Sequence, residues 1–202
     1  MTQADPAPRG DKRERIIDAA IAVFADRGFH KARVTDIAHR AGVADGTIYL
    51  YFRNKEDLLL TIFEEKMDLI IASLKATLAP IDDPLERIHA FALHHYSLVR
   101  RERALAEVLQ VELRLSNRFL KEYRPEKLWK YLGLFAQVVR DGQERGVIRA
   151  DMDPFIVMWA FFGAIDELGM QWILARKKAR FKLDQAAHQV ADIFIQGIQA
   201  RP

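Results

Sequence analysis

Apolar residues recur every three or four positions along almost the whole chain, and no stretch alternates apolar and polar residues as a strand does. This spacing puts apolar side chains on one face of successive helices and predicts an all-α fold. In the first such stretch, residues 13–29, the inward residues are Ile16, Ile17, Ala20, Ile21 and Phe24. Gly28 is expected to close that helix.

The same spacing, together with capping residues, predicts the later helices. A short helix ends at Gly42, a second short helix spans 46–52, and a long helix runs from Lys55 to about Leu78. Asn54 is its expected N-cap, with Asp57 at the third position. Beyond a proline-marked break the predicted helices are 84–99, 103–118, 125–146, 153–176 and 183–199.

Composition removes several classes of protein. The 202 residues include no cysteine, which excludes disulfide frameworks, thiolate zinc sites and cysteine nucleophiles, and fits a reducing cytoplasm, the predicted location. No secretion signal is recognisable. The most apolar stretch, residues 154–165, is too short to cross a bilayer, so we expect it to be buried in protein and expect no membrane partner.

The formal net charge of +3 is unevenly distributed. Residues 1–60 hold 10 Lys and Arg against 9 Asp and Glu, a net +1, whereas residues 100–150 hold 12 against 7, a net +5. Charge alone is therefore a weak indication of DNA binding. The basic middle of the chain would equally suit a small molecule that carries phosphates.

Two short helices joined by a tight turn form a helix-turn-helix, at about 34–53. In the second short helix Ile48 and Phe52 are four apart and must face the core, which leaves hydroxyls and one leucine to meet phosphates and base edges. The predicted DNA-binding set is Thr35, Asp45, Gly46, Thr47, Tyr49, Leu50, Tyr51 and Lys55. Asp45 either accepts from a cytosine amino group or caps the helix, and we favour the cap.

The stretch GFHKARVTDIAHRAGVADGTIYLYFRNKEDLL, residues 28–59, resembles the N-terminal signature of TetR-family transcriptional regulators. The resemblance covers about residues 12–67. It implies a DNA-binding homodimer on a palindromic operator, with a variable ligand pocket in the C-terminal domain and dimerisation through the last two helices. The apolar surface of the predicted helix 153–176 on nearly all sides independently favours a dimer. The expected organisation is a flexible tail at 1–10, a helix-turn-helix domain at 11–55, and a ligand-binding and dimerisation domain at 56–202.

Two further stretches, VELRLSN (111–117) and FFGAIDELGMQWIL (161–174), resemble the TetR-type repressors of fatty-acid degradation, the FadR-like group. That resemblance implies long-chain acyl-CoA as the effector that releases DNA, and no other cofactor. The residues expected to line an acyl-chain tunnel are Phe91, Leu98, Leu105, Leu109, Leu134, Phe135, Val138, Trp159 and Phe162. The arginines expected to bind the CoA phosphates are Arg100, Arg101, Arg103, Arg114 and Arg118.

Other hypotheses stay open at this stage. A regulator of efflux would bind an uncharged or cationic hydrophobic compound and would not need these arginines. An architectural DNA binder would tolerate many sequences, and an acyl-CoA-handling enzyme would need a reactive group that no Ser, His and Asp arrangement supplies. The histidines at 89, 94 and 95 lack the spacing of a helical metal site, so no metal is expected. Asp166 and Glu167 are expected to pair with Arg114 or another arginine.

Overall fold

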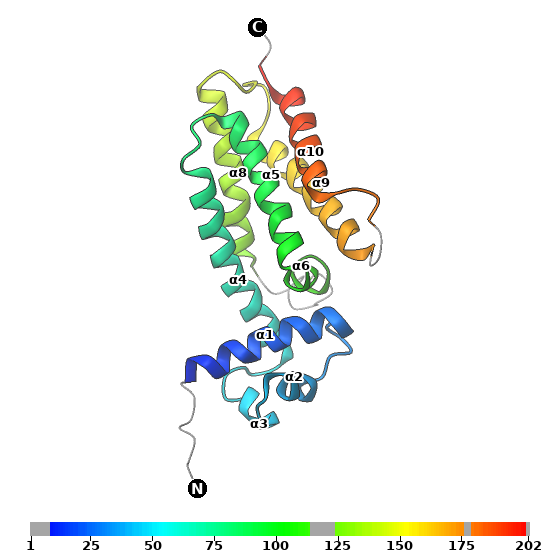
Figure 1. Ribbon diagram of the computed structural model, residues 1–202. Coiled ribbons are helices and arrows are strands. Elements are labelled where there is room, and N and C mark those ends of the chain that lie inside the picture. The colour runs from blue at the N-terminus through cyan, green and yellow to red at the C-terminus, as the bar shows by residue number, and fades with distance from the viewer. Residues whose placement is uncertain (1–8, 114–123, 176–178, 201–202) are drawn as a thin grey trace. The chain divides into compact units, whose positions relative to one another are not determined.

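The structure is a computed structural model that describes residues 9–113, 124–175 and 179–200. It confirms the all-α class, because the only strand-like pairing in these residues is one isolated bridge between Ile148 and Gln199. The helices, shown in Figure 1, are α1 (Arg9–Arg27), α2 (Val34–Ala41), α3 (Asp45–Ile48), α4 (Lys55–Leu78), α5 (Pro84–Arg101), α6 (Arg103–Glu107), the π-helix η1 (Val108–Glu112), α8 (Glu126–Glu144), α9 (Pro154–Leu174) and α10 (Leu183–Ile198).

The chain forms two compact units. Among the described residues, unit 1 comprises 9–65 and 107–113, and unit 2 comprises 66–106 with everything after 123. The helix-turn-helix, formed by α2, α3 and the turn between them, lies in unit 1. Unit 1 additionally contains the first part of α4 and the π-helix η1, two segments that the sequence analysis placed in the C-terminal domain.

The core of unit 1 is built on the predicted face of α1. All five residues expected on that face are buried, and α1 packs against α2 and η1. The α2 helix ends at Gly42 in the left-handed conformation (φ 66°), where its N–H bonds the carbonyls of Ala38 and His39. The Arg15 guanidinium donates to the Ala41 carbonyl at 2.9 Å, which ties α1 to the end of α2.

The α4 helix begins and ends as predicted. At its start the Asn54 side chain accepts from the Asp57 N–H at 2.8 Å, and the Asp57 carboxylate accepts from the Arg53 N–H at 2.9 Å. The predicted helix 46–52 is wrong in extent: α3 ends at Ile48 and the chain continues in turns to Phe52, which is buried.

A second difference concerns the predicted helix at 103–118. It is α-helical only to Glu107 and continues as the π-helix η1 to Glu112, where the Leu113 N–H bonds the Val108 carbonyl. Residues 114–118 lie outside the described residues.

Unit 2 contains α5, α8, α9 and α10 packed around stacked aromatic side chains. The ring centres of Phe135 and Phe161 lie 4.1 Å apart, with an angle of 10° between the ring planes. Phe91 packs edge-on against Phe135, with 5.3 Å between the ring centres. Asp83 and Asp153 cap α5 and α9 by accepting backbone N–H bonds at 2.8 and 2.7 Å. Each cap precedes a proline at the first helical position, which its missing N–H and fixed φ suit.

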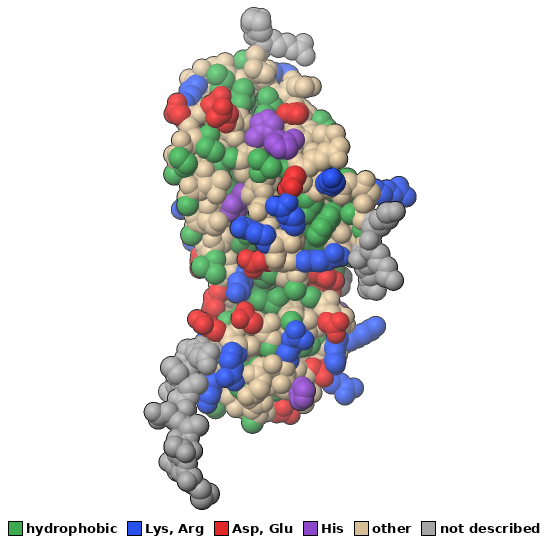
Figure 2. All heavy atoms as spheres, in the orientation of Figure 1, with side chains coloured by type: hydrophobic (Ala, Val, Ile, Leu, Met, Phe, Trp, Pro, Cys, Tyr) green, Lys and Arg blue, Asp and Glu red, His purple; other side chains and the backbone are tan. Residues whose placement is uncertain are grey.

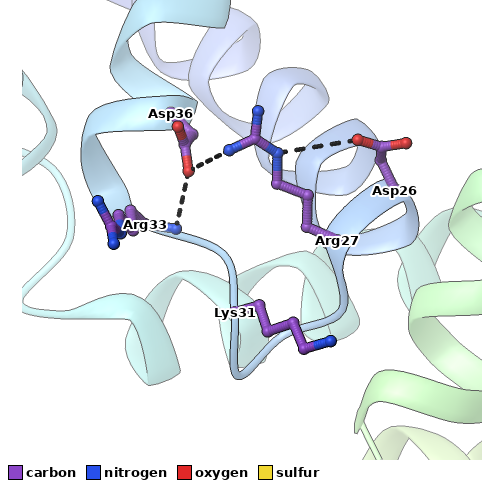
Figure 3. A pocket seen from close by; sticks show the side chains of 5 residues that line it. All are labelled: Asp26, Arg27, Lys31, Arg33 and Asp36. Atoms are coloured by element: carbon purple, nitrogen blue, oxygen red, sulfur yellow. Dashed lines mark hydrogen bonds and ion pairs between the residues drawn. The ribbon is translucent and has the colours of Figure 1, made fainter.

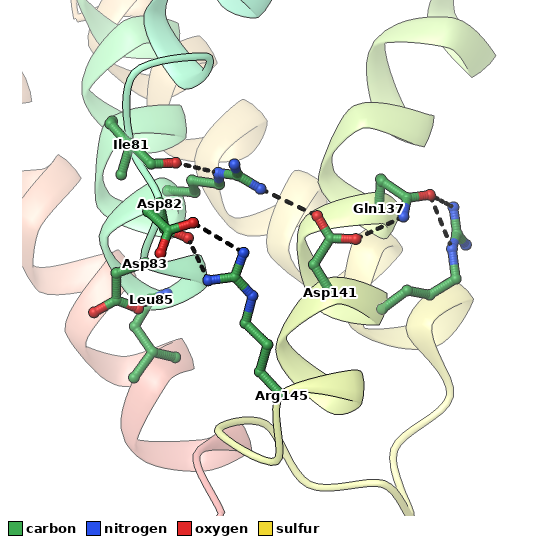
Figure 4. A network of polar contacts seen from close by, with 9 residues as sticks. Ile81, Asp82, Asp83, Leu85, Gln137, Asp141 and Arg145 are labelled. Carbon is green, nitrogen blue, oxygen red and sulfur yellow. Dashed lines mark hydrogen bonds and ion pairs between the residues drawn. The ribbon is translucent and has the colours of Figure 1, made fainter.

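A polar network fixes the loop between α4 and α5 to α8 (Figure 4). The Arg87 guanidinium donates to the Ile81 carbonyl at 2.6 Å and to Asp141 on α8 at 3.1 Å. At the end of α8, Arg145 donates to both the carbonyl and the carboxylate of Asp82 at 3.0 Å. The hydrogen bond and charge of Arg145 lower the pKa of the Asp82 carboxyl.

Within a single chain, residues 154–165 are only partly buried, and their cover by a second copy stays a prediction. On α9, Val157, Met158 and Phe161 are buried, whereas Phe155 and Ile156 are 55% and 65% exposed. No helix in the described parts of the chain combines the length and apolar character needed to cross a membrane.

Two glycines of α8 provide a matched test of this packing. A Cβ at Gly142 would lie 2.4 Å from Cδ1 and 3.2 Å from Cβ of the buried Ile148, whereas a Cβ at Gly133 would meet nothing within 4 Å. We expect Gly142→Ala to lower the free energy of unfolding by about 1–3 kcal/mol through overpacking. Gly133→Ala should raise it by about 0.5–1 kcal/mol through helix propensity. Urea denaturation would measure both, and equal effects at the two sites would contradict the packing.

Candidate functional site

Among the described residues of unit 1, the turns after α3 present the most exposed large apolar side chains. Tyr49 is 58% exposed and Leu50 81% exposed, whereas Ile48 and Phe52 are each only 2% exposed. The orientation predicted for these residues is therefore confirmed. Thr35, Asp45 and Gly46 are exposed, and Thr47 and Tyr51 are half-buried. A Cβ at Gly46 would meet nothing within 4 Å, so packing inside the protein does not require a glycine there.

Asp45 does not cap the helix. The N-cap position of α3 is Ala44, which has no side-chain hydrogen bond, and Asp45 is the first helical residue. The cap favoured from sequence is therefore wrong. The negative charge of Asp45 lies in the first turn of α3, where it interacts favourably with the helix dipole.

Lys55 has a structural role that the sequence did not reveal. Its ammonium donates to the carbonyls of Phe29, His30 and Ala32 at 2.7, 3.3 and 3.1 Å, and lies 4.5 Å from the centre of the Phe29 ring. An ammonium has three hydrogens. A phosphate contact by Lys55 would therefore have to replace one of these bonds, and its predicted DNA contact stays a prediction.

A polar depression of about 440 Å³ lies beside the turn between α1 and α2, lined by Asp26, Arg27, Lys31, Arg33 and Asp36 (Figure 3). Asp36 is engaged inside it, accepting from Arg27 at 2.7 Å and from the Arg33 N–H at 3.3 Å. The side chains of Lys31 and Arg33 are exposed just before the N-terminus of α2. Cations beside a helix N-terminus favour phosphate.

Lys31 and Arg33 were absent from the predicted DNA-binding set. The signal available in the sequence was the pair of basic residues in HKAR, directly before a predicted helix. Figure 2 shows why bulk charge did not reveal them, because Lys and Arg side chains alternate with Asp and Glu over the visible face of unit 1.

Salt dependence can separate base contacts from phosphate contacts at this surface. Tyr49→Phe should weaken operator binding by about 1–3 kcal/mol if the hydroxyl bonds a base edge, with an unchanged salt slope. Lys31→Ala should weaken binding to all sequences and reduce the slope of log K against log salt by about one. Fluorescence anisotropy over a salt series measures both. If the slope of log K against log salt for Lys31→Ala equalled that of the wild type, the phosphate contact would be contradicted.

In unit 2 the predicted acyl-chain residues are only partly brought together. Phe91, Leu105, Phe135 and Val138 are buried, and Leu98, Leu134 and Phe162 are half-buried. Leu109 belongs to unit 1. Trp159 is 36% exposed and contacts Trp129 at 5.5 Å between ring centres, which does not fit a dry tunnel within one chain.

The predicted phosphate-binding arginines differ in availability. Arg100 pairs with Asp184 at 2.6 Å. Arg103 donates to the Ile173 carbonyl at 2.5 Å and stacks over Trp172 at 5.0 Å, so it fastens α6 to the end of α9. Arg101 is exposed, and Arg114 and Arg118 lie outside the described residues.

A cluster of buried polar side chains lies where α5 meets α4, α8 and α9. His94 bonds Ser73 at 2.9 Å, and His95 bonds the Tyr131 hydroxyl at 3.0 Å. Burial raises the pKa of Tyr131 and of Tyr96, with a further contribution from the charge of Asp166. The described residues contain no group of three or more His, Asp or Glu that could hold a metal ion.

The two neighbouring acids of α9 have different environments. Asp166 is buried, whereas Glu167 is exposed and accepts from Gln171 at 2.8 Å. Glu167 therefore lies at the surface and bonds a side chain of its own helix. The predicted partner Arg114 lies outside the described residues, so pairing of Asp166 with it stays a prediction.

The two histidines predict a pH dependence of stability. Burial lowers the pKa of His94 and of His95 to about 4, from 6.5. Between pH 4 and pH 6.5 the two histidines bind more protons in the unfolded chain than in the folded one, so acidification favours unfolding. We expect the melting temperature to be constant above about pH 7 and to fall as the pH drops from 6.5 toward 4. Each histidine contributes at most about 1.4 kcal/mol per pH unit. His94→Gln should flatten the fall, and an unchanged pH profile would contradict the buried neutral state.

Comparison with known families accounts for both units. Residues 16–62 match the family described as bacterial regulatory proteins, tetR family, and residues 63–197 match that described as YsiA-like protein, C-terminal region. The chain belongs to the TetR family, whose members are transcription regulators. The resemblance inferred from the helix-turn-helix is therefore confirmed.

Relatives that match most of the chain indicate which group of TetR-family regulators it resembles. The fatty acid metabolism regulator protein of Bacillus subtilis is 36% identical over 184 residues, 91% of this chain and 94% of that protein. A crystal structure of FadR from Bacillus subtilis in complex with stearoyl-CoA matches with a TM-score of 0.85, covering 92% of this chain and 98% of that one. The fatty acid degradation regulator FadR from Bacillus halodurans matches at 35% identity and a TM-score of 0.83, over 91% and 98% of the two chains. The predicted resemblance to the FadR-like group is thus also confirmed.

Proposed function

We propose that the protein represses fatty-acid degradation genes by binding a palindromic operator, and that long-chain acyl-CoA releases it. The observation that carries the proposal is the full-length likeness to a regulator crystallised with stearoyl-CoA. DNA binding is supported by Tyr49 and Leu50, which are exposed beside the buried Ile48. We call the surface formed by Tyr49, Leu50 and their exposed neighbours the reading surface, because it would contact the base edges. The protein would act in the cytoplasm, where bacterial DNA lies.

A homodimer is part of the proposal. Among the described residues, five large apolar side chains of α9 and α10 are exposed on a single chain: Phe155, Ile156, Trp159, Leu174 and Ile193. A second copy that covered these helices would bury them. Two reading surfaces set about 34–36 Å apart would then meet two half-sites of a palindrome.

The effector class follows from what each part of acyl-CoA requires. An acyl chain needs apolar surroundings, and its burial contributes roughly 0.8 kcal/mol per methylene. The buried Phe91, Leu105 and Val138 are apolar residues of the kind needed. The CoA phosphates need cations, and among the predicted arginines Arg101 is exposed.

Release from DNA requires that the effector bind the DNA-incompetent form more tightly than the competent form. A shift from mostly bound to mostly free requires a few kcal/mol of such differential affinity. The long apolar chain and the charged head of acyl-CoA together offer a binding energy large enough to supply that difference. No chemical step is proposed, so acyl-CoA should be recovered intact.

The test is a mobility shift with DNA from the protein's own upstream region, titrated with palmitoyl-CoA, free palmitate and free CoA. We expect release by palmitoyl-CoA alone, without hydrolysis. Arg101→Ala should require at least fivefold more palmitoyl-CoA, because a phosphate contact is lost. Arg140→Ala, which removes an exposed arginine of α8 that bonds Gln137, should behave as wild type.

Binding to DNA that is indifferent to all three compounds would contradict the effector and favour an efflux-type regulator. Turnover of palmitoyl-CoA would contradict the assignment as a regulator without enzymatic activity.

A further inference from the structure

The segment 107–112 connects the two units in an unusual way. It folds with unit 1, while the chain before it (66–106) and the chain after 123 belong to unit 2. The chain therefore leaves unit 2 at the end of α6, enters unit 1 as η1, and later returns to unit 2 at α8. A displacement of α6 would act on η1 through a continuous backbone.

At the end of this segment, Glu112 reaches the turn between α1 and α2. Its Oε2 atom accepts from the Phe29 N–H at 2.6 Å, in a buried bond between residues 83 positions apart. Glu112 is only 8% exposed. A buried carboxylate costs free energy unless it is hydrogen-bonded. The bond from the Phe29 N–H therefore stabilises Glu112 in its buried position.

The turn itself is shaped to receive the carboxylate. Gly28 has φ +76°, and a Cβ there would lie 3.5 Å from Oε2 of Glu112. A side chain at this position would be strained by the backbone and would also touch the carboxylate. Glycine thus lets the turn bring the Phe29 N–H against Glu112.

The same turn is held from a second side by Lys55, whose ammonium bonds three of its carbonyls. The Glu112 carboxylate accepts from a backbone N–H of the turn, and the Lys55 ammonium donates to its carbonyls. Two side chains of opposite charge therefore hold the turn in place. Phe29 itself is 2% exposed and packs on Phe24 at 5.4 Å. The turn leads directly into α2, and its position therefore sets that of the helix-turn-helix.

The direction of Glu112 depends on η1. A π-helix contains one more residue per hydrogen-bonded turn than an α-helix, and such turns are frequent at functional sites. Returning this segment to α-helical bonding would rotate later side chains by about 100°, the angle per residue of an α-helix. That rotation would take the carboxylate away from Phe29.

We propose that Glu112 is a positioning residue for DNA recognition: its bond to the Phe29 N–H sets the α1–α2 turn, and with it α2 and the reading surface. The proposal rests on the proposed function only in that the protein binds an operator. It does not depend on the identity of the effector.

The experiment uses full-length protein and an operator that the wild type selects from random duplex DNA, at a temperature well below the melting temperature of every variant. Glu112→Ala should weaken operator binding at least tenfold and accelerate hydrogen exchange of the Phe29 amide at least tenfold. Glu112→Gln keeps an oxygen that can accept the bond, so both quantities should stay within about threefold of wild type.

Glu65→Gln is the matched control. It alters another carboxylate of unit 1, one that pairs with Arg13 on α1 but does not contact the turn. Operator affinity and Phe29 exchange in this variant should stay within about threefold of wild type. A merely structural role for Glu112 would lower the melting temperature and leave operator affinity and Phe29 exchange unchanged.

Operator binding by Glu112→Ala within twofold of wild type would overturn the proposal. An equal loss in Glu65→Gln would also overturn it, because general loosening of α1 would then explain the effect. A palmitoyl-CoA titration of the wild type separates the two proposals. Failure of palmitoyl-CoA to release the operator contradicts the effector and leaves the comparison of Glu112 variants intact.

Discussion

The bonding of Lys55 to the α1–α2 turn is the interaction on which the reading surface depends. Its ammonium satisfies three carbonyls of the turn between α1 and α2, those of Phe29, His30 and Ala32, which belong to neither helix. Lys55 is also the first residue of α4, so one side chain joins the turn before the helix-turn-helix to the helix after it. The exposed residues Tyr49 and Leu50 lie between these two fixed points along the chain.

Local signals predicted much of this fold. The start of α4 follows from Asn54 and Asp57, whose capping bonds involve residues three or four positions apart. The contact of Glu112 with Phe29 joins residues 83 positions apart, and no periodicity or spacing reports it. The role of Lys55 was missed for the same reason. A lysine at the start of a helix suggests a phosphate, and only the tertiary structure shows the carbonyls beside it.

Hydrophobic periodicity does not report which chain covers an apolar side chain. The α9 helix is apolar on nearly all sides, and Phe155 and Ile156 are exposed within a single chain, so the burial predicted for them requires a second copy. Charge counting has a similar weakness. The basic region at 100–150 was read as a phosphate site, but Arg100 is paired with Asp184 and Arg103 with the Ile173 carbonyl. Charge near a site therefore does not measure how many cations are available to a ligand.

An effector can alter operator affinity only through contacts whose free energy differs between the two forms of the protein. Exposed ion pairs are poor candidates, because each contributes roughly 0–1 kcal/mol. A buried carboxylate that loses its hydrogen bond is different, since an unsatisfied buried group costs several times more. Glu112 is such a group, and it lies on the segment in which the chain leaves unit 2 and enters unit 1. One hydrogen bond at this place has the magnitude that a two-state regulator requires.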